Sequence, residues 1–237
     1  RIRVETPIKE DKVKFYTGLY HALLGRGLAS DVNGAYPKND GSIGQLPMKD
    51  GKPAYNVYNT DGIWGGQWNL SQLWIMAYPE YMSQYVSTHL QAYKDAGWLA
   101  DGLANNRYVS GVGTNLLPTV IAGAYQWGIR DFDTALAYEA CLKNELDGTN
   151  RPMGAGKVDT DRFTQYGYVP HEDQGAGPLE AFLFSASHTL EYSYSSWAVA
   201  QWAKQLNDTA NYNRLMYLSK GWERLYDPST NFIRPKK

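Results

Sequence analysis

A carboxylate among aromatic residues marks residues 188–197 (HTLEYSYSSW) as the stretch whose residue types best suit chemistry on a substrate. Its apolar members recur at the i, i+4, i+7 and i+8 positions of a helix: Leu190, Tyr194, Trp197 and Ala198. Glu191 lies beside this stripe, and we expect it near the start of a helix, where free N–H groups favour a carboxylate. A sugar-cleaving site would use such a carboxyl group, but a plain amphipathic helix with a solvated glutamate gives the same pattern.

Other clusters of reactive side chains are less complete. His171-Glu172-Asp173 is the best local acid cluster and could carry acid–base work, although no partner for it is defined. Asp159-Thr160-Asp161 lacks the rest of an EF-hand loop and is predicted to be a solvated turn. His21, His89 and His188 are far apart, with no pair at i, i+4, which disfavours a zinc site.

The composition excludes several classes of protein. The net charge is −1 over 237 residues and the basic residues form no stripe, so binding to nucleic acid is not expected. No apolar run approaches the roughly 20 residues of a membrane span. Aromatic residues make up 14% of the chain, and their flat rings suit the faces of sugars as well as large helical cores. The single cysteine, Cys141, falls in a helical pattern and is predicted to be a buried structural thiol.

Helical periodicity accounts for most of the chain, and no long segment alternates as a strand would. The predicted helices cover residues 9–24, 67–77, 80–95, 116–127, 133–146, 187–206 and 211–225. Turn signals rich in Gly, Asn, Asp and Pro fill 25–66 and 147–178, where we expect long loops with small hairpins. The pattern predicts a bundle, solenoid or toroid of helical hairpins.

An ordered set of short motifs gives the chain a family resemblance. They are FYTGLYH (15–21), DVNG (31–34), DG (40–41), YNT (58–60) before Trp64, LPTVIA (117–122), GIRDFD (128–133), GYVP (167–170), HTLEY (188–192), YDP (226–228) and FIRP (232–235). With these motifs the chain resembles the central part of the catalytic domain of glycoside hydrolase family 92, the calcium-dependent exo-α-mannosidases.

The resemblance implies a mainly α fold, in which the chain supplies part of an (α/α)6 toroid. It also implies that residues 1–237 are an incomplete catalytic domain, with an N-terminal β-sandwich and a C-terminal catalytic segment absent. Family members are inverting enzymes, which use a carboxylic acid and a carboxylate on opposite faces of the sugar, while calcium grips sugar hydroxyls. The resemblance places the motifs that carry the acid, the base and the main calcium ligands beyond residue 237. It therefore assigns no calcium ligand within residues 1–237.

Several positions depart from the family pattern. Trp64-Gly65 stands where the family usually has Trp-Asp, Gly113-Thr114-Asn115 where it has Gly-Asp-His, and Ser195-Ser196-Trp197 where it has Asp-Asp-Trp. These replacements remove carboxylates that would orient a sugar or support the site. They indicate either a changed specificity or a divergent member with weak or no activity.

Three residues are predicted to contact substrate: Trp64 by stacking on a sugar ring, Glu191 as a site carboxylate, and Asp40 in the cleft. Glu191 is also a weak candidate for a catalytic group. Asp31, Asn33 and Asp40 could instead bind calcium, but turn chemistry alone also explains them.

The leading hypothesis is a segment of an inverting, calcium-dependent exo-α-mannosidase that cleaves α-mannosides such as α-1,2-linked mannose. We expect it to be secreted, periplasmic or in the cell envelope, although residues 1–5 (RIRVE) are not a signal peptide. We expect it to need missing segments of its own polypeptide and to be inactive alone. The alternatives are a carbohydrate-binding or scaffolding helical module without chemistry, and a glycosidase of different sugar specificity.

Overall fold

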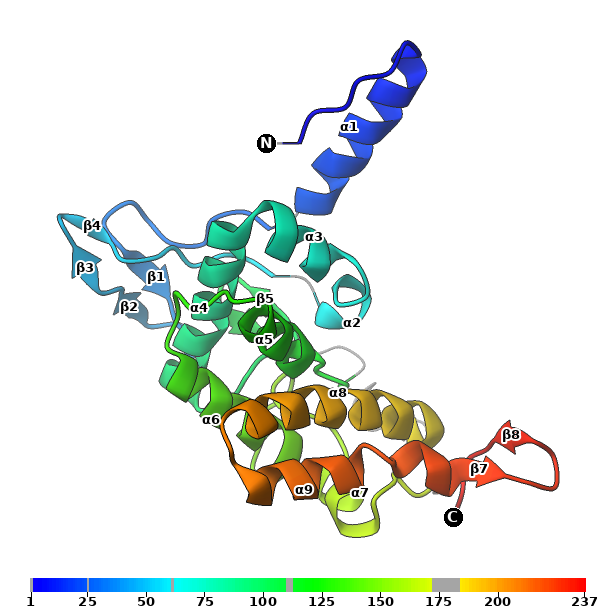
Figure 1. Cartoon of the computed structure of the whole chain (residues 1–237). Coiled ribbons are helices and arrows are strands. Elements are labelled where there is room, and N and C mark those ends of the chain that lie inside the picture. Colours follow the sequence, from blue (N-terminus) through cyan, green and yellow to red (C-terminus); the bar gives the residue numbers. More distant parts are fainter. Residues whose placement is uncertain (1, 25, 61, 110–112, 172–183) are drawn as a thin grey trace.

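Stacked helices form the body of the protein (Figure 1), and the described residues also form four small antiparallel hairpins. The computed structural model describes residues 2–24, 26–60, 62–109, 113–171 and 184–237. Its helices are α1 (Lys9–Leu23), α2 (Ile63–Gly66), α3 (Leu70–Ala77), α4 (Pro79–Ala96), α5 (Leu117–Gln126), α6 (Thr134–Leu146), α7 (Thr160–Tyr166), α8 (Ser185–Gln205) and α9 (Thr209–Leu218). A short 3-10 helix, Gly221–Leu225, follows α9.

Each strand pairs with the next one along the chain in an antiparallel hairpin. The pairs are β1 (Ala35–Pro37) with β2 (Ile43–Gln45), β3 (Met48–Lys49) with β4 (Lys52–Pro53), β5 (Leu103–Ala104) with β6 (Arg107–Tyr108), and β7 (Tyr226–Asp227) with β8 (Phe232–Ile233). The first two hairpins lie in the loop-rich region 25–66, as the turn signals predicted.

Several helices begin at a capping aspartate or end at a glycine, both of which are recognisable in the sequence. The side chain of Asp133 accepts a hydrogen bond from the backbone N–H of Leu136 at 3.0 Å, so it caps α6. Asp208 caps α9 in the same way through Asn211 at 3.1 Å. α4 ends at Gly97, whose φ of 80° is left-handed and suits glycine.

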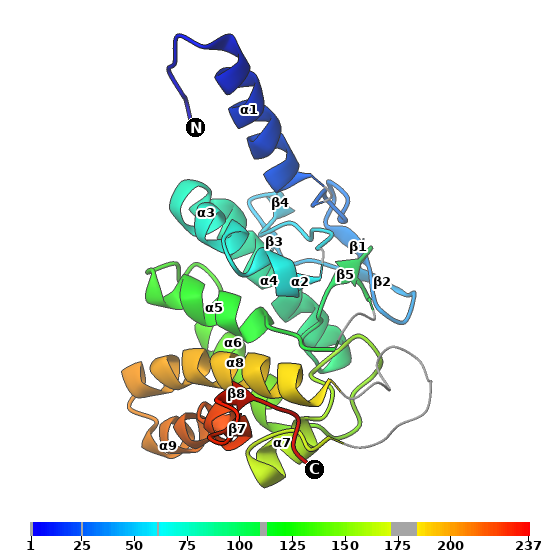
Figure 2. The ribbon, with the colours of Figure 1, turned by 90° about the vertical axis from the view of Figure 1, so that its right-hand side faces the viewer.

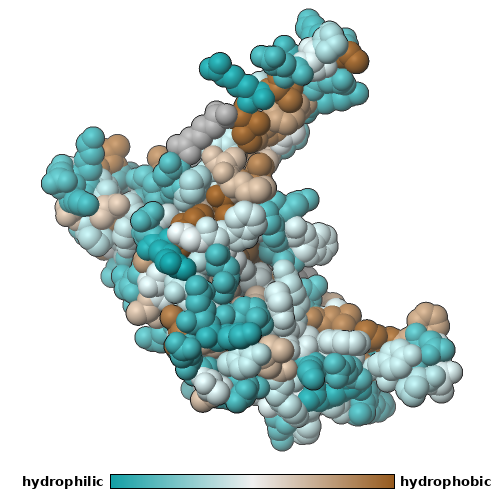
Figure 3. Space-filling view, in the orientation of Figure 1, coloured by the Kyte–Doolittle hydropathy of each residue, from teal (hydrophilic) through white to brown (hydrophobic). Residues whose placement is uncertain are grey.

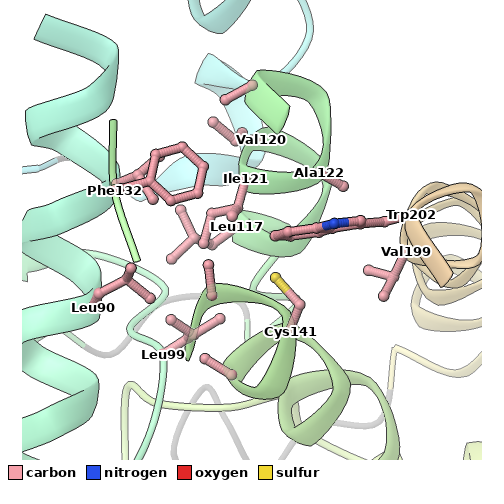
Figure 4. Close-up of a cluster of buried hydrophobic side chains, with 14 of the residues drawn as sticks. Leu90, Leu99, Leu117, Val120, Ile121, Ala122, Phe132, Cys141, Val199 and Trp202 are labelled. Carbon is pink, nitrogen blue, oxygen red and sulfur yellow. The ribbon is translucent and has the colours of Figure 1, made fainter. Parts of the chain in front are cut away.

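The main core lies between α3, α4, α5, α6, α8 and α9, which Figure 2 shows stacked in layers. Trp202 of α8 is fully buried in it and stacks on Tyr125 of α5, with ring centroids 4.5 Å apart. Cys141 of α6 is also fully buried, which confirms the prediction of a structural thiol; Figure 4 shows it beside Leu117 and Trp202.

Two expectations about the elements were wrong. Residues 160–166, predicted to be loop, form α7, because Phe163 is buried against Tyr192 with ring centroids 5.4 Å apart. The last predicted helix, 211–225, is divided into α9 and the 3-10 helix. The large apolar residues at helical spacing in α8 face outward.

The outward stripe of α8 has a packing reason. Leu190, Tyr194 and Trp197 are 40%, 45% and 49% exposed. The buried face combines small residues with a few large ones: Thr189, Tyr192, Ser193, Ser195, Ser196, Val199, Ala200, Trp202 and Ala203. Small side chains let α8 come close to α5 and α6, so a pattern read from large apolar residues alone selects the wrong face.

Helix α1 stands apart from the layered body (Figures 1 and 2). None of its residues is buried, and Val13, Tyr16 and Tyr20 are exposed. Hydrophobic side chains are visible along it in Figure 3. No helix within the described parts of the chain is both long and apolar enough to cross a membrane.

Candidate functional site

Glu191 lies in an open pocket between α8 and the start of α3. The pocket measures about 320 Å³ and is lined by Gln67, Trp68, Gln72, Leu190, Glu191 and Tyr194. Trp68 is 65% exposed and Tyr194 is 45% exposed, so two aromatic side chains present surface near one carboxyl group. The sequence suggested Tyr194 as a neighbour of Glu191, whereas Trp68 comes from a segment more than a hundred positions away and was missed.

The helix position of Glu191 differs from the expectation. α8 begins at Ser185, which places Glu191 two turns into the helix. The charge effect of the free N–H groups falls off within the first turn, so it does not act on Glu191. Partial burial raises the pKa of the Glu191 carboxyl above its ordinary value, while the charges of His188 and Lys157 oppose this rise.

His188, one turn before Glu191, is held in place by Asp159 and Tyr192. Its Nδ1 lies 3.2 Å from Oδ2 of Asp159, and its ring stacks on Tyr192 with centroids 5.2 Å apart. The Asp159 side chain is only 8% exposed, so the prediction that 159–161 is a solvated turn is wrong for this residue. Asp159 is instead a buried partner that fixes the first turns of α8 onto the start of α7.

A buried polar network lies under the turn of α8 that follows Glu191. The ammonium group of Lys157 donates hydrogen bonds to Oε1 of Glu145 and to the hydroxyl of Ser195. The hydroxyls of Ser195 and Ser196 donate to Oε2 of Glu145 at 3.1 and 3.0 Å. Lys157 and Glu145 are each 1% exposed. Burial lowers the pKa of Lys157, and the Glu145 carboxylate opposes this effect.

Sequence reasoning missed this network, although one signal for it was present. The helix 133–146 carries Ala137, Ala140 and Cys141 on one face, and Asn144 and Glu145 continue the same i, i+3, i+4, i+7, i+8 stripe. All five are buried. The stripe predicts a buried carboxylate at the end of the helix, and such a group requires a partner.

Positions that depart from the family pattern gather around this network. Asn115 donates to the backbone oxygen of Leu99 at 2.9 Å and to Oδ1 of Asn144 at 3.0 Å. Ser195, Ser196 and Asn115 are fully buried, and Thr114 is 6% exposed. None of them is among the described residues that line the Glu191 pocket, and the side chains of Asn115, Ser195 and Ser196 hydrogen-bond to buried groups instead.

Asp40, another predicted substrate contact, is not among the described residues that line this pocket. Asp40 is exposed in the β1–β2 turn, where its Oδ1 accepts from the backbone N–H and the hydroxyl of Ser42 at 2.9 and 2.7 Å, which lowers its pKa. Asn33 likewise accepts from the N–H of Ala35 at 3.0 Å. These contacts are the turn chemistry that the sequence analysis gave as the alternative to a role in binding substrate or calcium.

Trp64 is the second residue of the short helix α2, but its side chain lies outside the described part of the structure. The neighbouring Gly65 is exposed, and a Cβ added there would meet no atom within 4 Å. The loss of a side chain at 65 is therefore not forced by packing.

The acid cluster 171–173 and the calcium expectation both stay predictions. Glu172 and Asp173 lie outside them, while the backbone N–H of His171 donates to the backbone oxygen of Lys236 at 2.7 Å. Across the described ranges, no group of three or more His, Cys, Asp or Glu side chains is placed to hold a metal ion.

The family model for the glycosyl hydrolase family 92 catalytic domain matches residues 1–237. The chain belongs to glycoside hydrolase family 92. A relative named "uncharacterized secreted glycosidase", from Arthroderma benhamiae, is 31% identical over 170 residues, which are 69% of this chain and 21% of that protein.

Solved family 92 structures share the fold. A family GH92 α-mannosidase from Bacteroides thetaiotaomicron is 22% identical with a TM-score of 0.82, over 99% of this chain and 29% of that one. A family GH92 inverting mannosidase from the same organism is 21% identical with a TM-score of 0.79, over 99% of this chain and 30% of that one. The mainly α segment of a helical toroid, with small hairpins, is confirmed. The chain spans less than a third of the length of these relatives.

Proposed function

We propose that this family 92 chain is part of a glycoside hydrolase that removes sugar residues from α-mannosides. The observation that carries the proposal is the half-buried Glu191 carboxyl, which lines one pocket with the exposed rings of Trp68 and Tyr194. All 237 residues of the chain match the model of the family 92 catalytic domain. Solved proteins of this fold are titled α-mannosidase and inverting mannosidase, which favours mannose as the sugar.

The chemistry of the pocket suits a sugar. Aromatic rings offer flat apolar area to the C–H face of a pyranose, and the carboxyl group offers hydrogen bonds to its hydroxyls. Partial burial raises the pKa of the Glu191 carboxyl, which favours its protonated form relative to an exposed glutamate, and a protonated carboxyl group can donate as well as accept. We assign Glu191 to substrate binding, with a catalytic role as the weaker alternative.

Inverting hydrolysis needs two carboxyl groups about 6.5–9.5 Å apart. The six residues that line the pocket include one carboxyl group. We therefore propose that further segments of the polypeptide supply the acid and the base. The same segments would cover the exposed faces of α1 and α8 and would carry any calcium ligands. The name of the Arthroderma relative supports secretion, and we propose an extracytoplasmic location.

Turnover by the complete protein tests the proposal. Aryl α-mannoside and α-1,2-mannobiose are supplied with and without a calcium chelator, and the anomeric form of the released sugar is followed by NMR. We expect β-mannose as the first product and loss of turnover with chelator. Binding without turnover would favour the carbohydrate-binding module, and turnover of another glycoside alone would favour a changed specificity.

A matched pair of variants ties turnover to the pocket. Glu191→Gln keeps the shape of the side chain and removes its ionisation, and we expect kcat/KM to fall by about tenfold to a hundredfold. Glu223→Gln makes the same change at an exposed residue of the 3-10 helix and should have no effect.

A further inference from the structure

The fully buried ion pair between Glu145 of α6 and Lys157 stands directly beneath the turn of α8 that follows Glu191. Both side chains are 1% exposed, so each charge is removed from bulk solvent. Replacing a buried pair by apolar residues is often neutral or stabilising, so such a pair is weak evidence for a purely stabilising role. Its position next to the candidate site suggests another role.

Every hydrogen-bonding atom of the pair faces α8 or the partner. The two carboxylate oxygens of Glu145 take the hydroxyls of Ser195 and Ser196 as well as the ammonium group of Lys157. Lys157 also bonds to the Ser195 hydroxyl and lies over the ring of Tyr192, 5.0 Å from its centroid. The turn 192–196 is thereby fixed in rotation about the helix axis and in translation along it.

The backbone beside Lys157 holds the same turn. The hydroxyl of Tyr192, the residue after Glu191, donates to the backbone oxygen of Val158 and lies 3.2 Å from that of Gly113. One side of α8 at this turn is therefore bonded to the 157–158 segment. The opposite side carries Tyr194, and Glu191 directly before the turn, into the pocket.

We propose that Lys157 and Glu145 are a positioning pair for Glu191: they fix the turn of α8 that aims the Glu191 carboxyl into the pocket, and the Lys157 charge acts on that carboxyl through the helix. The inference rests on the proposed function for its effect on turnover, but not for its effect on Glu191 itself. The positive charge of Lys157 favours ionisation of Glu191, and His188, whose ring lies beside the Asp159 carboxylate, acts in the same direction.

The test compares Lys157→Met with the double variant Lys157→Met/Glu145→Gln in the complete protein. The single change leaves a buried carboxylate unpaired, so the unfolding midpoint should drop strongly. The double change removes both charges while the glutamine still accepts from the serines, so most of the stability should return. Arg234→Met, which breaks the exposed ion pair with Asp227, is the control and should alter neither stability nor Glu191.

Glu191 is read out directly by titration of its carboxyl resonance in protein labelled with ¹³C-glutamate, assigned with Glu191→Gln. Both Lys157 variants should raise the pKa of Glu191, since both lack the ammonium group. We also expect kcat/KM to fall about a hundredfold in both, mainly through kcat, as for a displaced site group.

A merely structural role gives a different result. In that case the double variant would regain activity together with stability, and the pKa of Glu191 would not move; either result would overturn the proposal. If Lys157→Met does not fold, the double variant carries the same measurement. If the unmodified protein shows no turnover, the proposed function fails, while the titration still decides the inference.

Discussion

At the scale of single residues, the environment of Glu191 links function to stability. Because partial burial raises its pKa, the folded state favours the protonated form. The stabilisation is complete below the pKa of the unfolded chain and is lost as the pH rises through the higher folded value.

We therefore expect Glu191→Gln to raise the melting temperature relative to the unmodified protein at pH 7–8, with the difference vanishing near pH 4. Thermal unfolding at a series of pH values measures this. Equal melting temperatures throughout the range would mean that the carboxyl group is not desolvated in the fold.

Trp68 offers a second test at this scale. Stacking of an aromatic ring contributes on the order of 1 kcal/mol, so Trp68→Ala should weaken binding of an α-mannoside inhibitor by about fivefold to tenfold. Trp127, equally exposed at 63% but not among the pocket residues, is the control, and Trp127→Ala should bind normally. Equal losses in calorimetry would contradict a specific role for Trp68.

At the scale of elements, α8 has one face buried in the core and one face exposed. One face carries Trp202 into the core, where it stacks on Tyr125, and the other carries Tyr194 and Trp197 outward. The same helix thus joins the core to the pocket, which is why its position matters for Glu191.

The two faces predict different costs for the same substitution. Trp202→Ala should reduce the free energy of unfolding by about 3–5 kcal/mol, because it leaves a cavity in a close-packed core. Trp197→Ala, at a residue that is 49% exposed, should change it by less than about 1 kcal/mol in the 237-residue chain. Chemical denaturation compares them, and a reversed order would mean that α8 packs by its other face.

Elements were the most predictable level of the structure. Helices α3, α5 and α6 fall within the predicted ranges, and the bounds of α4 and α8 differ from the predicted ones by no more than two residues. Proline, glycine and aspartate mark several of these ends locally. The face of α8 was not predictable in this way, since its buried side depends on serine and alanine residues that fit against α5 and α6. Only tertiary contacts, such as Lys157 with Ser195, show which side is inside.

The candidate site was predictable in part for the same reason. Glu191 and Tyr194 share a helix and could be paired from spacing, whereas Trp68 and Lys157 are brought to them by the fold. Asp40 was predicted as a substrate contact, and the structure instead gives its carboxylate to Ser42 in a turn. Its role toward a sugar stays a prediction.

At the scale of the whole molecule, the chain is an arc of helical hairpins with some apolar side chains on its outward faces. Val13, Tyr16 and Tyr20 of α1 and Trp197 of α8 are all exposed. Figure 3 shows hydrophobic areas along α1 on an otherwise largely hydrophilic surface. Family 92 relatives are more than three times as long, which agrees with a catalytic centre shared between this arc and other segments. On this account, the pocket at Glu191 is one wall of a larger sugar site.

The most direct test is a crystal structure of the complete protein with a mannose-like inhibitor bound. The account predicts that the sugar ring lies against Trp68 or Tyr194, with a hydroxyl or the ring nitrogen of the inhibitor within hydrogen-bonding distance of the Glu191 carboxyl. An inhibitor bound in a closed site that contains neither Glu191 nor these rings would contradict it.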